Sequence, residues 1–360
     1  MHENSPPSIP GIEHQAVYYK NDEYSAHPFN AGMWRVDDET IVLGFRRIKC
    51  DYTNNAQLSH PRLDTYGEIC TIRSSDGGET WEDTSLVGRI SELSEEILYG
   101  TPPEVEAVDP TKPSVLLASW TAPSLLWGKG QPWVMRSTDN GQQFGQPTRV
   151  PKFHFERVHG RPNYAVRNDG ATILTLSAYE KGNEHPRPVT YASFDGCQNW
   201  TFISYISDKT DLPRILPMPV SVEGNRLLTT VRVNPTGGSF WTEIYESLDG
   251  GRSWSFLSRP NDHGAPADVI ELSDGRLFCV YGYRRPPQGV RCRFSTDGGE
   301  TWEKEWTIRD DSATRDVGYP RAVENENGEI IVGYYINVQE KDIPVDGGVR
   351  HIAVSRFAPP

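Results

Sequence analysis

The chain has 360 residues, of which 36 are basic and 49 are acidic, giving a formal net charge of −13. This charge argues against binding to nucleic acid or to an anionic membrane surface, because either partner requires a basic footprint. The 10 Trp, 16 Tyr, 32 Gly and 28 Pro favour strands and turns over helices, and the only stretch with helical character is 90–98.

The five cysteines are widely spaced, odd in number and without a CxxC motif, which predicts buried free thiols rather than a disulfide framework or a zinc site. We therefore expect no metal and no cofactor. The N-terminal seven residues contain no apolar stretch of the kind found in signal peptides, and no segment is apolar enough to span a membrane. These features predict a soluble chain, which is either cytoplasmic or secreted after removal of a leader; the compartment and the oligomeric state stay open.

One eight-residue pattern recurs five times, with Ser first, Asp third, Gly or Asn fourth, and Trp or Phe last. The copies are Ser74–Trp81, Ser137–Phe144, Ser193–Trp200, Ser247–Trp254 and Ser295–Trp302. Their aspartates lie 48 to 63 residues apart, a period that suits one four-stranded sheet with its loops. In the third copy Cys197 replaces the second glycine, so that its turn is expected to be a variant.

This spacing predicts an all-β fold, a six-bladed β-propeller of about 60 residues per blade. Hairpin turns are expected at 169–170, 223–224, 274–275 and 327–328, where Gly follows Asp, Glu or Asn between β-rich runs. The last blade has no box, so the strand at 14–19 is expected to join the strand at 351–357 and close the ring. The prediction is a single domain over 1–360, preceded by a tail at 1–13.

The repeated pattern is an Asp box, and the chain resembles the sialidase-like propellers over most of its length. In that family the boxes lie on the blade rim, away from the active centre, so they predict the fold rather than the chemistry. The resemblance implies a site at the opposite ends of the blades, where loops enter the innermost strands and leave the second strands. At these positions the chain is rich in His, Tyr and Arg, a composition that suits recognition of an anionic sugar.

Individual positions also resemble the sialidase pattern. Asp64 looks like the acid/base of blade one, Tyr319 like the nucleophile, and Arg232 like the second arginine of the carboxylate-binding triad. Either Arg284 or Arg285 looks like the third arginine.

Two positions depart from that pattern. The first triad arginine belongs where the chain has 28–30, Pro-Phe-Asn, and the glutamate that activates the tyrosine belongs near Leu216. A tyrosine requires a base or a strong electrostatic partner to attack as phenolate. Glu180 of blade three is a candidate for that base.

A second resemblance covers about 60 residues of the first blade. The run from Asp22 to Pro28, the pair Arg46-Arg47 and the His60-Pro-Arg loop are similar to propellers that act on rhamnose-capped glucuronic acid as hydrolases or lyases. A uronate lyase needs a cation to neutralise the carboxylate and a His or Tyr to move protons.

The sequence therefore predicts a carbohydrate-active enzyme that cleaves a glycosidic bond at a uronic or sialic acid, by hydrolysis or by β-elimination. An exo-sialidase of the tyrosine-nucleophile type and a non-catalytic glycan-binding propeller stay open as alternatives. The candidate catalytic residues are Tyr319, Asp64, His60, His263 and His159. The candidate substrate-binding residues are Arg232, Arg285, Arg284, Arg47, Arg161, Arg214, His27, Tyr283 and Glu180. The expected partner is an acidic oligosaccharide or polysaccharide.

Overall fold

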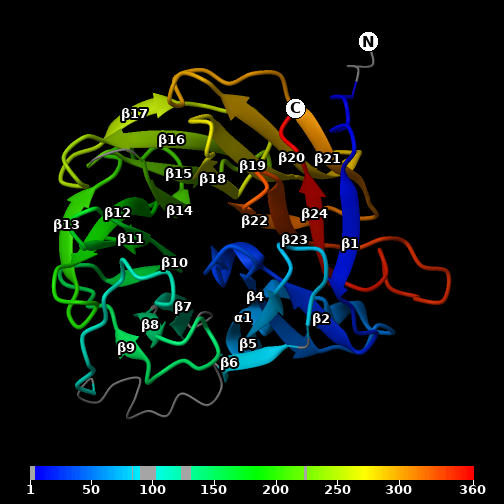
Figure 1. Cartoon of the computed structure of the whole chain (residues 1–360), viewed down its shortest axis with the longest axis horizontal. Helices are drawn as coiled ribbons and strands as arrows, with labels where there is room; N and C mark the ends of the chain where they lie inside the picture. Colours follow the sequence, from blue (N-terminus) through cyan, green and yellow to red (C-terminus); the bar gives the residue numbers. More distant parts are fainter. Residues whose placement is uncertain (1–4, 83, 90–102, 123–130, 223–224) are drawn as a thin grey trace.

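In the computed structural model of the chain, the described residues are 5–82, 84–89, 103–122, 131–222 and 225–360. Their strands form six sheets arranged as the blades of a propeller around a common axis (Figure 1). The predicted all-β, six-bladed fold is therefore confirmed.

Blade one contains five strands and blade two contains three. The strands of blade one are β2 (Glu23–Ala26), β3 (Met33–Arg35), β4 (Ile41–Lys49), β5 (Glu68–Ser74) and β6 (Ser85–Arg89). The strands of blade two are β7 (Leu116–Ala122), β8 (Gln131–Ser137) and β9 (Thr148–Arg149).

Blades three to six contain four strands each. Blade three has β10 (Arg157–Val166), β11 (Thr172–Tyr179), β12 (Arg187–Ser193) and β13 (Thr201–Tyr205). Blade four has β14 (Arg214–Ser221), β15 (Leu227–Val233), β16 (Trp241–Ser247) and β17 (Ser255–Ser258). Blade five has β18 (Ala267–Glu271), β19 (Leu277–Tyr283), β20 (Gln288–Ser295) and β21 (Trp306–Ser312). Blade six has β22 (Gly318–Glu324), β23 (Ile330–Ile336), β24 (His351–Phe357) and β1 (Glu13–Tyr18).

The two ends of the described chain close the ring in blade six, as predicted. Strand β1 pairs antiparallel with β24, so that Gln15 lies opposite Val354 (Figure 1). A tail is predicted over 1–13, and the described residues of this segment include one that packs in the core. Ile9 is buried in the core of blades five and six, and its amide donates to the Thr307 carbonyl of β21 at 3.2 Å. This apolar anchor holds the segment against the outer strand of blade five.

All five Asp boxes form the same turn. In the box of blade four, the Ser247 hydroxyl donates to Asp249 and accepts from the Gly251 amide, each at 2.8 Å. The third box makes the same contacts, because the Cys197 amide donates to the Ser193 hydroxyl at 3.0 Å with Cys197 at φ 64°. A cysteine therefore adopts the left-handed conformation that the glycine at this position adopts in the other boxes. The prediction of a variant turn in the third box is wrong.

The predicted hairpin turns at 169–170, 274–275 and 327–328 are confirmed by glycines with φ between 75° and 85°. The turn expected at 223–224 and the helical stretch expected at 90–98 lie outside the described residues. The α-helix that the structure describes is α1 (His60–Tyr66), between β4 and β5; short 3₁₀ helices cover Pro28–Asn30 and Asn55–Gln57. Ser59 caps its N-terminus by accepting from the Arg62 amide, and Gly67 ends it. Because His60 and Asp64 are four residues apart, they lie on one face of this helix.

Three innermost strands or their extensions carry a residue with positive φ immediately before a proline. These residues are His27 (φ 65°), Leu216 (φ 54°) and Tyr319 (φ 49°), and the pairing register shifts next to Leu216 and Tyr319. Non-glycine residues rarely adopt this conformation, so packing must hold it in place. Phe29, Leu216 and Tyr319 belong to one buried apolar cluster, which supplies that packing.

We predict that Ser247→Ala lowers the free energy of unfolding by about 1–3 kcal/mol, because the buried Gly251 amide and the Asp249 carboxylate both lose a partner. Urea denaturation measures the change. The matched control is Ser255→Ala at the exposed start of β17. If the two variants are equally stable, the hydrogen bonds of Ser247 do not stabilise the blade.

Candidate active site

Ten charged or aromatic side chains from blades one, four, five and six gather where the innermost strands begin and the second strands end. We call this group the central cluster. Its members are His27, Arg46, His60, Asp64, Arg232, Arg284, Asp316, Tyr319, Tyr335 and Arg350.

Tyr319 lies at the centre of this cluster, with 6% of its surface exposed. A guanidinium nitrogen of Arg232, on β15, lies 3.4 Å from the Tyr319 hydroxyl. The Arg284 guanidinium, which follows β19, lies 5.3 Å from the centre of the Tyr319 ring. On the other side, the His27 ring packs against Tyr319 with centroids 4.5 Å apart. The phenol oxygen therefore lies beside two arginines that would stabilise negative charge developing on it.

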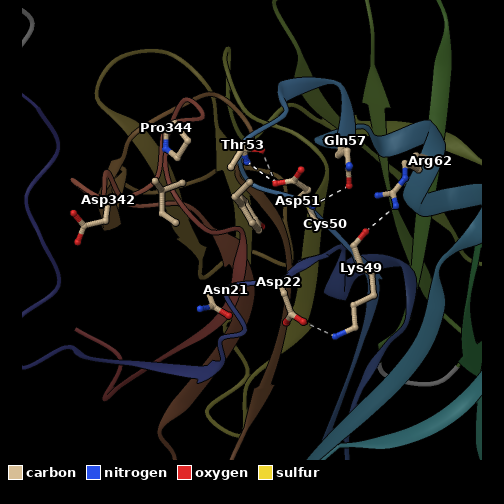
Figure 2. Close-up of a pocket in the computed structure, with 12 residues that line it drawn as sticks. Asn21, Asp22, Lys49, Cys50, Asp51, Thr53, Gln57, Arg62, Asp342 and Pro344 are labelled. Carbon is tan, nitrogen blue, oxygen red and sulfur yellow. Dashed lines mark hydrogen bonds and ion pairs between the residues drawn. The ribbon is translucent and has the colours of Figure 1, made fainter.

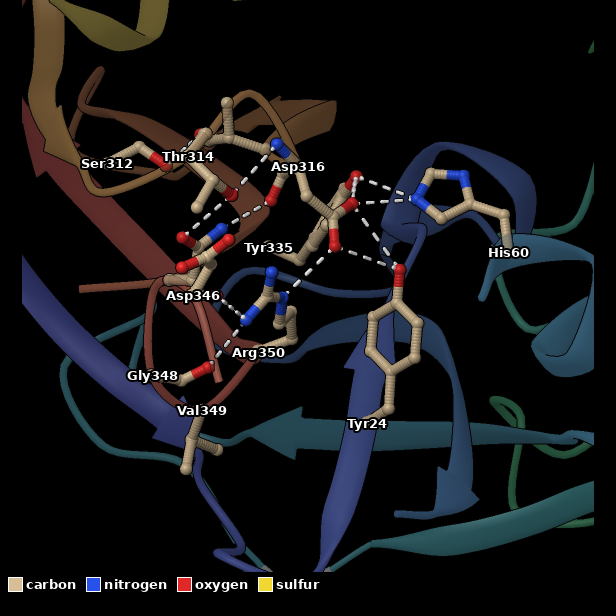
Figure 3. A network of polar contacts seen from close by, with 12 residues as sticks. Tyr24, His60, Ser312, Thr314, Asp316, Tyr335, Asp346, Gly348, Val349 and Arg350 are labelled. Atoms are coloured by element: carbon tan, nitrogen blue, oxygen red, sulfur yellow. Dashed lines mark hydrogen bonds and ion pairs between the residues drawn. The ribbon is translucent and has the colours of Figure 1, made fainter. Parts of the chain in front are cut away.

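The Asp316 carboxylate, in the loop between β21 and β22, accepts contacts from blades one and six (Figure 3). The Nε2 atom of His60 lies 2.7 Å from one oxygen, and the Tyr335 hydroxyl donates to the same oxygen at 2.7 Å. Arg350 donates to the other oxygen at 3.1 Å, and Tyr24 donates at 3.2 Å. One carboxylate thus fixes side chains of β2, α1, β23 and the residue before β24.

This network shifts the pKa values of Asp316 and His60 in opposite directions. Burial alone would raise the pKa of the Asp316 carboxyl, but His60 and Arg350 outweigh it and hold that pKa well below its usual range. Burial alone would lower the pKa of His60, but the Asp316 carboxylate outweighs it and raises that pKa above its ordinary value of 6.5. Burial and Asp316 together raise the pKa of Tyr335 well above that of a free phenol, so Tyr335 is a hydrogen-bond donor here.

A second carboxylate lies on the other side of the histidines. Asp64 accepts from Arg46 at 2.8 Å, and Arg46 is 1% exposed. The Nδ1 atom of His27 lies 3.6 Å from the same Asp64 oxygen. Asp64 therefore balances the charge of a buried arginine, in addition to lying beside His27.

Several predicted site residues make their contacts away from the central cluster. Arg47 pairs with Glu68 and Tyr18, and its neighbour Arg46 faces the cluster because side chains alternate along β4. Arg214 is bound by Glu243 at 2.9 Å within blade four. The Tyr283 ring lies under the Arg291 guanidinium at 3.3 Å, within blade five.

Glu180, predicted as a candidate base for Tyr319, instead contacts Arg187 and Tyr205 of its own blade. Its ion pair with Arg187 gives this carboxylate a structural role in blade three.

The remaining candidates lie at the edge of the cluster or outside the described part. His263 and Arg285 line a hollow of about 20 Å³ together with Phe240 and Arg284. Arg285 itself is exposed and donates to Ser239 at 3.1 Å. His159 and Arg161 belong to β10, but their side chains lie outside the described residues.

Sequence reasoning did not select Asp316, Arg350 or Arg46 as site residues. Asp316 starts the loop segment that leads to Tyr319, so its position three residues before a candidate nucleophile was a usable signal. Arg350 belongs to a long loop between β23 and β24, and no local pattern indicates that its side chain reaches Asp316. Arg46 and Arg47 are distinguished only by which face of β4 each occupies.

A larger hollow of about 610 Å³ lies at the rim between blades one and six (Figure 2). Several of its charged groups contact one another or the backbone: Lys49 pairs with Asp22 at 2.8 Å, and Arg62 donates to the Lys49 carbonyl at 2.7 Å. Asp51 accepts from the amide and hydroxyl of Thr53. This hollow therefore offers a less reactive set of groups than the central cluster.

Among the described residues, no group of three His, Cys, Asp or Glu side chains is arranged to hold a metal ion. In the same part of the chain, no helix has the length and apolar character needed to cross a membrane.

The fold and the cluster define a sialidase-like β-propeller. The family model of the BNR repeat-like domain matches residues 104–332, and the chain belongs to this family. A sialidase of Bacteroides fragilis (strain YCH46) is 23% identical over 340 residues, covering 82% of this chain; the chain spans 58% of the length of that sialidase.

Solved structures share the fold at low sequence identity. A Dyadobacter fermentans DSM 18053 protein of unknown function superposes with a TM-score of 0.75 at 21% identity, covering 97% of this chain and 99% of the other. An α-L-arabinofuranosidase of Fusarium graminearum superposes with a TM-score of 0.60 at 14% identity, covering 95% and 98% of the two chains.

We predict that the contribution of His60 to the free energy of unfolding decreases as the pH rises above 6.5, the ordinary pKa of a histidine. A histidine whose pKa is raised in the folded state contributes stability that is fully present below 6.5 and is lost as the pH rises through the folded value. The variant His60→Gln should lose this part of the pH dependence, and His185→Gln, at the turn between β11 and β12, should keep it. Urea denaturation across this pH range measures both; parallel curves for wild type and His60→Gln would contradict the pairing with Asp316.

Proposed function

We propose that this chain is a glycan-cleaving enzyme that acts at an acidic sugar, with its reaction centre at Tyr319. The class of the reaction is glycosidic bond hydrolysis. The sialidase and the arabinofuranosidase that the chain is similar to support a glycosidase, while the charge of the central cluster supports an anionic substrate.

The observation that carries the proposal is the local excess of positive charge around Tyr319. The central cluster contains four arginines against two carboxylates, in a chain whose net charge is −13. Arg46 and Arg350 are each paired with one of these carboxylates. Arg284, by contrast, forms no ion pair with any residue in the described part of the chain; it donates to the Val317 carbonyl and lies over two aromatic rings.

In the proposed site, Arg232 and Arg284 bind the carboxylate of the sugar. Planar guanidinium groups suit this task because they can donate two parallel hydrogen bonds to one carboxylate. The Tyr319 hydroxyl loses its proton to solvent, and the negative charge on its oxygen is stabilised by the same two arginines. The oxygen bonds to the anomeric carbon as the glycosidic bond breaks, and His60, whose side chain is 32% exposed, gives its proton to the leaving oxygen. A water molecule then replaces the tyrosine oxygen at the anomeric carbon; one proton of this water returns to His60, and the tyrosine oxygen regains a proton from solvent.

A second candidate function is β-elimination from a uronate. Leu216 is the observation that favours it, because this residue packs in the same apolar cluster as Tyr319, where the sialidase pattern requires a glutamate. A lyase needs no such carboxylate: one group takes the C5 proton, the leaving oxygen receives a proton, and an arginine neutralises the sugar carboxylate. Tyr319 and His60 could fill the two proton-transfer roles.

We predict that the chain releases a terminal acidic sugar from a panel of sialosides and glucuronate-terminated oligosaccharides, and that Tyr319→Phe abolishes this turnover while retaining the fold. Product analysis separates the candidates: a free reducing sugar identifies hydrolysis, and a new unsaturated uronate absorbing in the ultraviolet identifies elimination. The control variant Tyr19→Phe, after β1, should remain active. Binding without turnover would indicate a glycan-binding propeller, and full activity of Tyr319→Phe would remove the tyrosine from the mechanism.

We predict that Arg284→Ala weakens binding of an acidic oligosaccharide by about ten- to a hundred-fold, because a charge-assisted contact to the carboxylate is lost. The neighbouring variant Arg285→Ala should retain affinity, since Arg285 is exposed and points to Ser239. Calorimetry on both variants in the Tyr319→Phe background measures binding without turnover. If Arg285→Ala weakens binding and Arg284→Ala does not, the sugar carboxylate is bound by Arg285 instead.

A further inference from the structure

Two histidines connect the two carboxylates of the central cluster in one continuous line. Asp316 lies 2.7 Å from Nε2 of His60. Nδ1 of His60 lies 3.3 Å from Nε2 of His27, and Nδ1 of His27 lies 3.6 Å from Asp64. Three of the four ring nitrogens therefore lie within hydrogen-bond distance of a partner, and the fourth, Nδ1 of His27, lies at ion-pair distance from Asp64. Both ends of the line are carboxylates.

The number of protons that this line requires follows from its contacts. An ionised carboxylate only accepts hydrogen bonds, so a proton is needed on Nε2 of His60. The negative charge of Asp64, 3.6 Å away, favours a second proton on Nδ1 of His27 over an unprotonated nitrogen at that position. The contact between the rings needs a third proton, because two unprotonated nitrogens would repel each other. Two neutral imidazoles carry only two protons on nitrogen. All three contacts are thus satisfied when the two rings together carry one extra proton.

We propose that His27 and His60 form a coupled pair that shares a single positive charge between Asp64 and Asp316. The shared proton lies between the rings: when the N–H bond at Nδ1 of His60 breaks, an N–H bond forms at Nε2 of His27, and the charge moves from one ring to the other. The outer protons stay in place, so this step requires no other reactant. Asp64 and Asp316 are positioning residues that hold the pair in this state.

The surroundings of the pair are consistent with one positive charge and not with two. The groups that face it from the neighbouring elements are Tyr24, Arg46, Asp64, Arg284, Asp316, Tyr319, Tyr335 and Arg350. Each carboxylate already has an arginine partner, so the environment does not favour a second imidazolium. His27 is fully buried, whereas His60 is partly exposed, so the proton shared by the rings connects a buried position with an accessible one.

The consequence for chemistry rests on the proposed function. With the pair charged, the central cluster carries three positive charges in excess of its carboxylates, which strengthens its attraction for an anionic sugar. His60 is then protonated for part of the time, as a group that protonates a leaving oxygen must be. His27, which lies between His60 and Asp64, would restore the proton from the buried side.

The experiment is proton-detected ¹⁵N NMR of the full chain with ¹⁵N-labelled histidine, which reports the protonation of each ring nitrogen among the nine histidines. His60→Gln and His27→Gln assign the signals. At about pH 7 we expect protonated shifts for Nε2 of His60 and Nδ1 of His27, and intermediate shifts for the two nitrogens that face each other. Both rings should change in the same titration step, as expected for coupled sites. If the wild-type protein instead shows two neutral rings that titrate in separate steps, this result by itself overturns the proposal.

Variants of the carboxylates supply the second measurement. Asp316→Asn should lower the midpoint of the shared step by about one pH unit or more, and the change should appear in the His27 signals as well as those of His60. Asp311→Asn is the matched control, because Asp311 pairs with Arg309 in blade five. A change confined to His60 would contradict the sharing of the proton.

This test needs no substrate, so its outcome is independent of the product assay. Separate titration of the histidines together with cleavage of an acidic sugar would reject only the coupled pair. A shared step without any cleavage would reject only the proposed function.

Discussion

The Asp316 carboxylate is the interaction on which the central cluster depends. It lies in the loop before β22 and binds groups from blade one as well as blade six, including His60 on the only α-helix that the described residues contain. Helix α1 is too short to hold its orientation by itself, because isolated helices of this length are not stable in water. The contact between His60 and Asp316 therefore helps to hold the helix over the end of blade one, together with the buried Leu63 and the pair of Asp64 with Arg46. Without this anion, His60, Tyr335 and Arg350 would lose their common partner.

Strained backbone positions complete the arrangement. His27 and Tyr319 both adopt positive φ before a proline, and their rings pack on each other with centroids 4.5 Å apart. Such positions persist only where the surrounding structure over-determines them, and they are frequent at functional sites. Here the buried neighbours include Phe29 and Leu216, which fill the two positions where the sialidase pattern has charged residues. Phe29 and Leu216 therefore lack the charge that the sialidase pattern has at these positions, but they provide apolar packing for Tyr319.

The fold was predictable from the sequence because the Asp boxes mark the blades directly. Even Cys197 keeps the local hydrogen bonds of its box, since the turn depends on Ser193 and on the backbone. The closing strand of blade six was predictable by elimination, as the last blade lacked an outer strand. The burial of Ile9 was not, because its partners on blades five and six are distant in sequence.

The site was predictable only in part. Tyr319, His60, Asp64, His27, Arg232 and Arg284 were all selected from the sequence, and the structure brings them together. Arg47 and Glu180 were selected with them, yet their contacts are ion pairs with Glu68 and Arg187. A sequence shows that an arginine ends a strand, but not which face it occupies or which carboxylate reaches it. Asp316 and Arg350 are separated in the sequence by strands β22 and β23 and a long loop, and only tertiary structure reveals their contact.

The central claim is that the cluster around Tyr319 recognises the negative charge of its sugar. The most direct measurement compares turnover of one cleavable acidic oligosaccharide with turnover of the same compound in which the sugar carboxylate is converted to a neutral carboxamide. The account predicts that kcat/KM falls by about a hundred-fold or more for the carboxamide, because the contacts to Arg232 and Arg284 lose their charge. Equal turnover of the two compounds would contradict it.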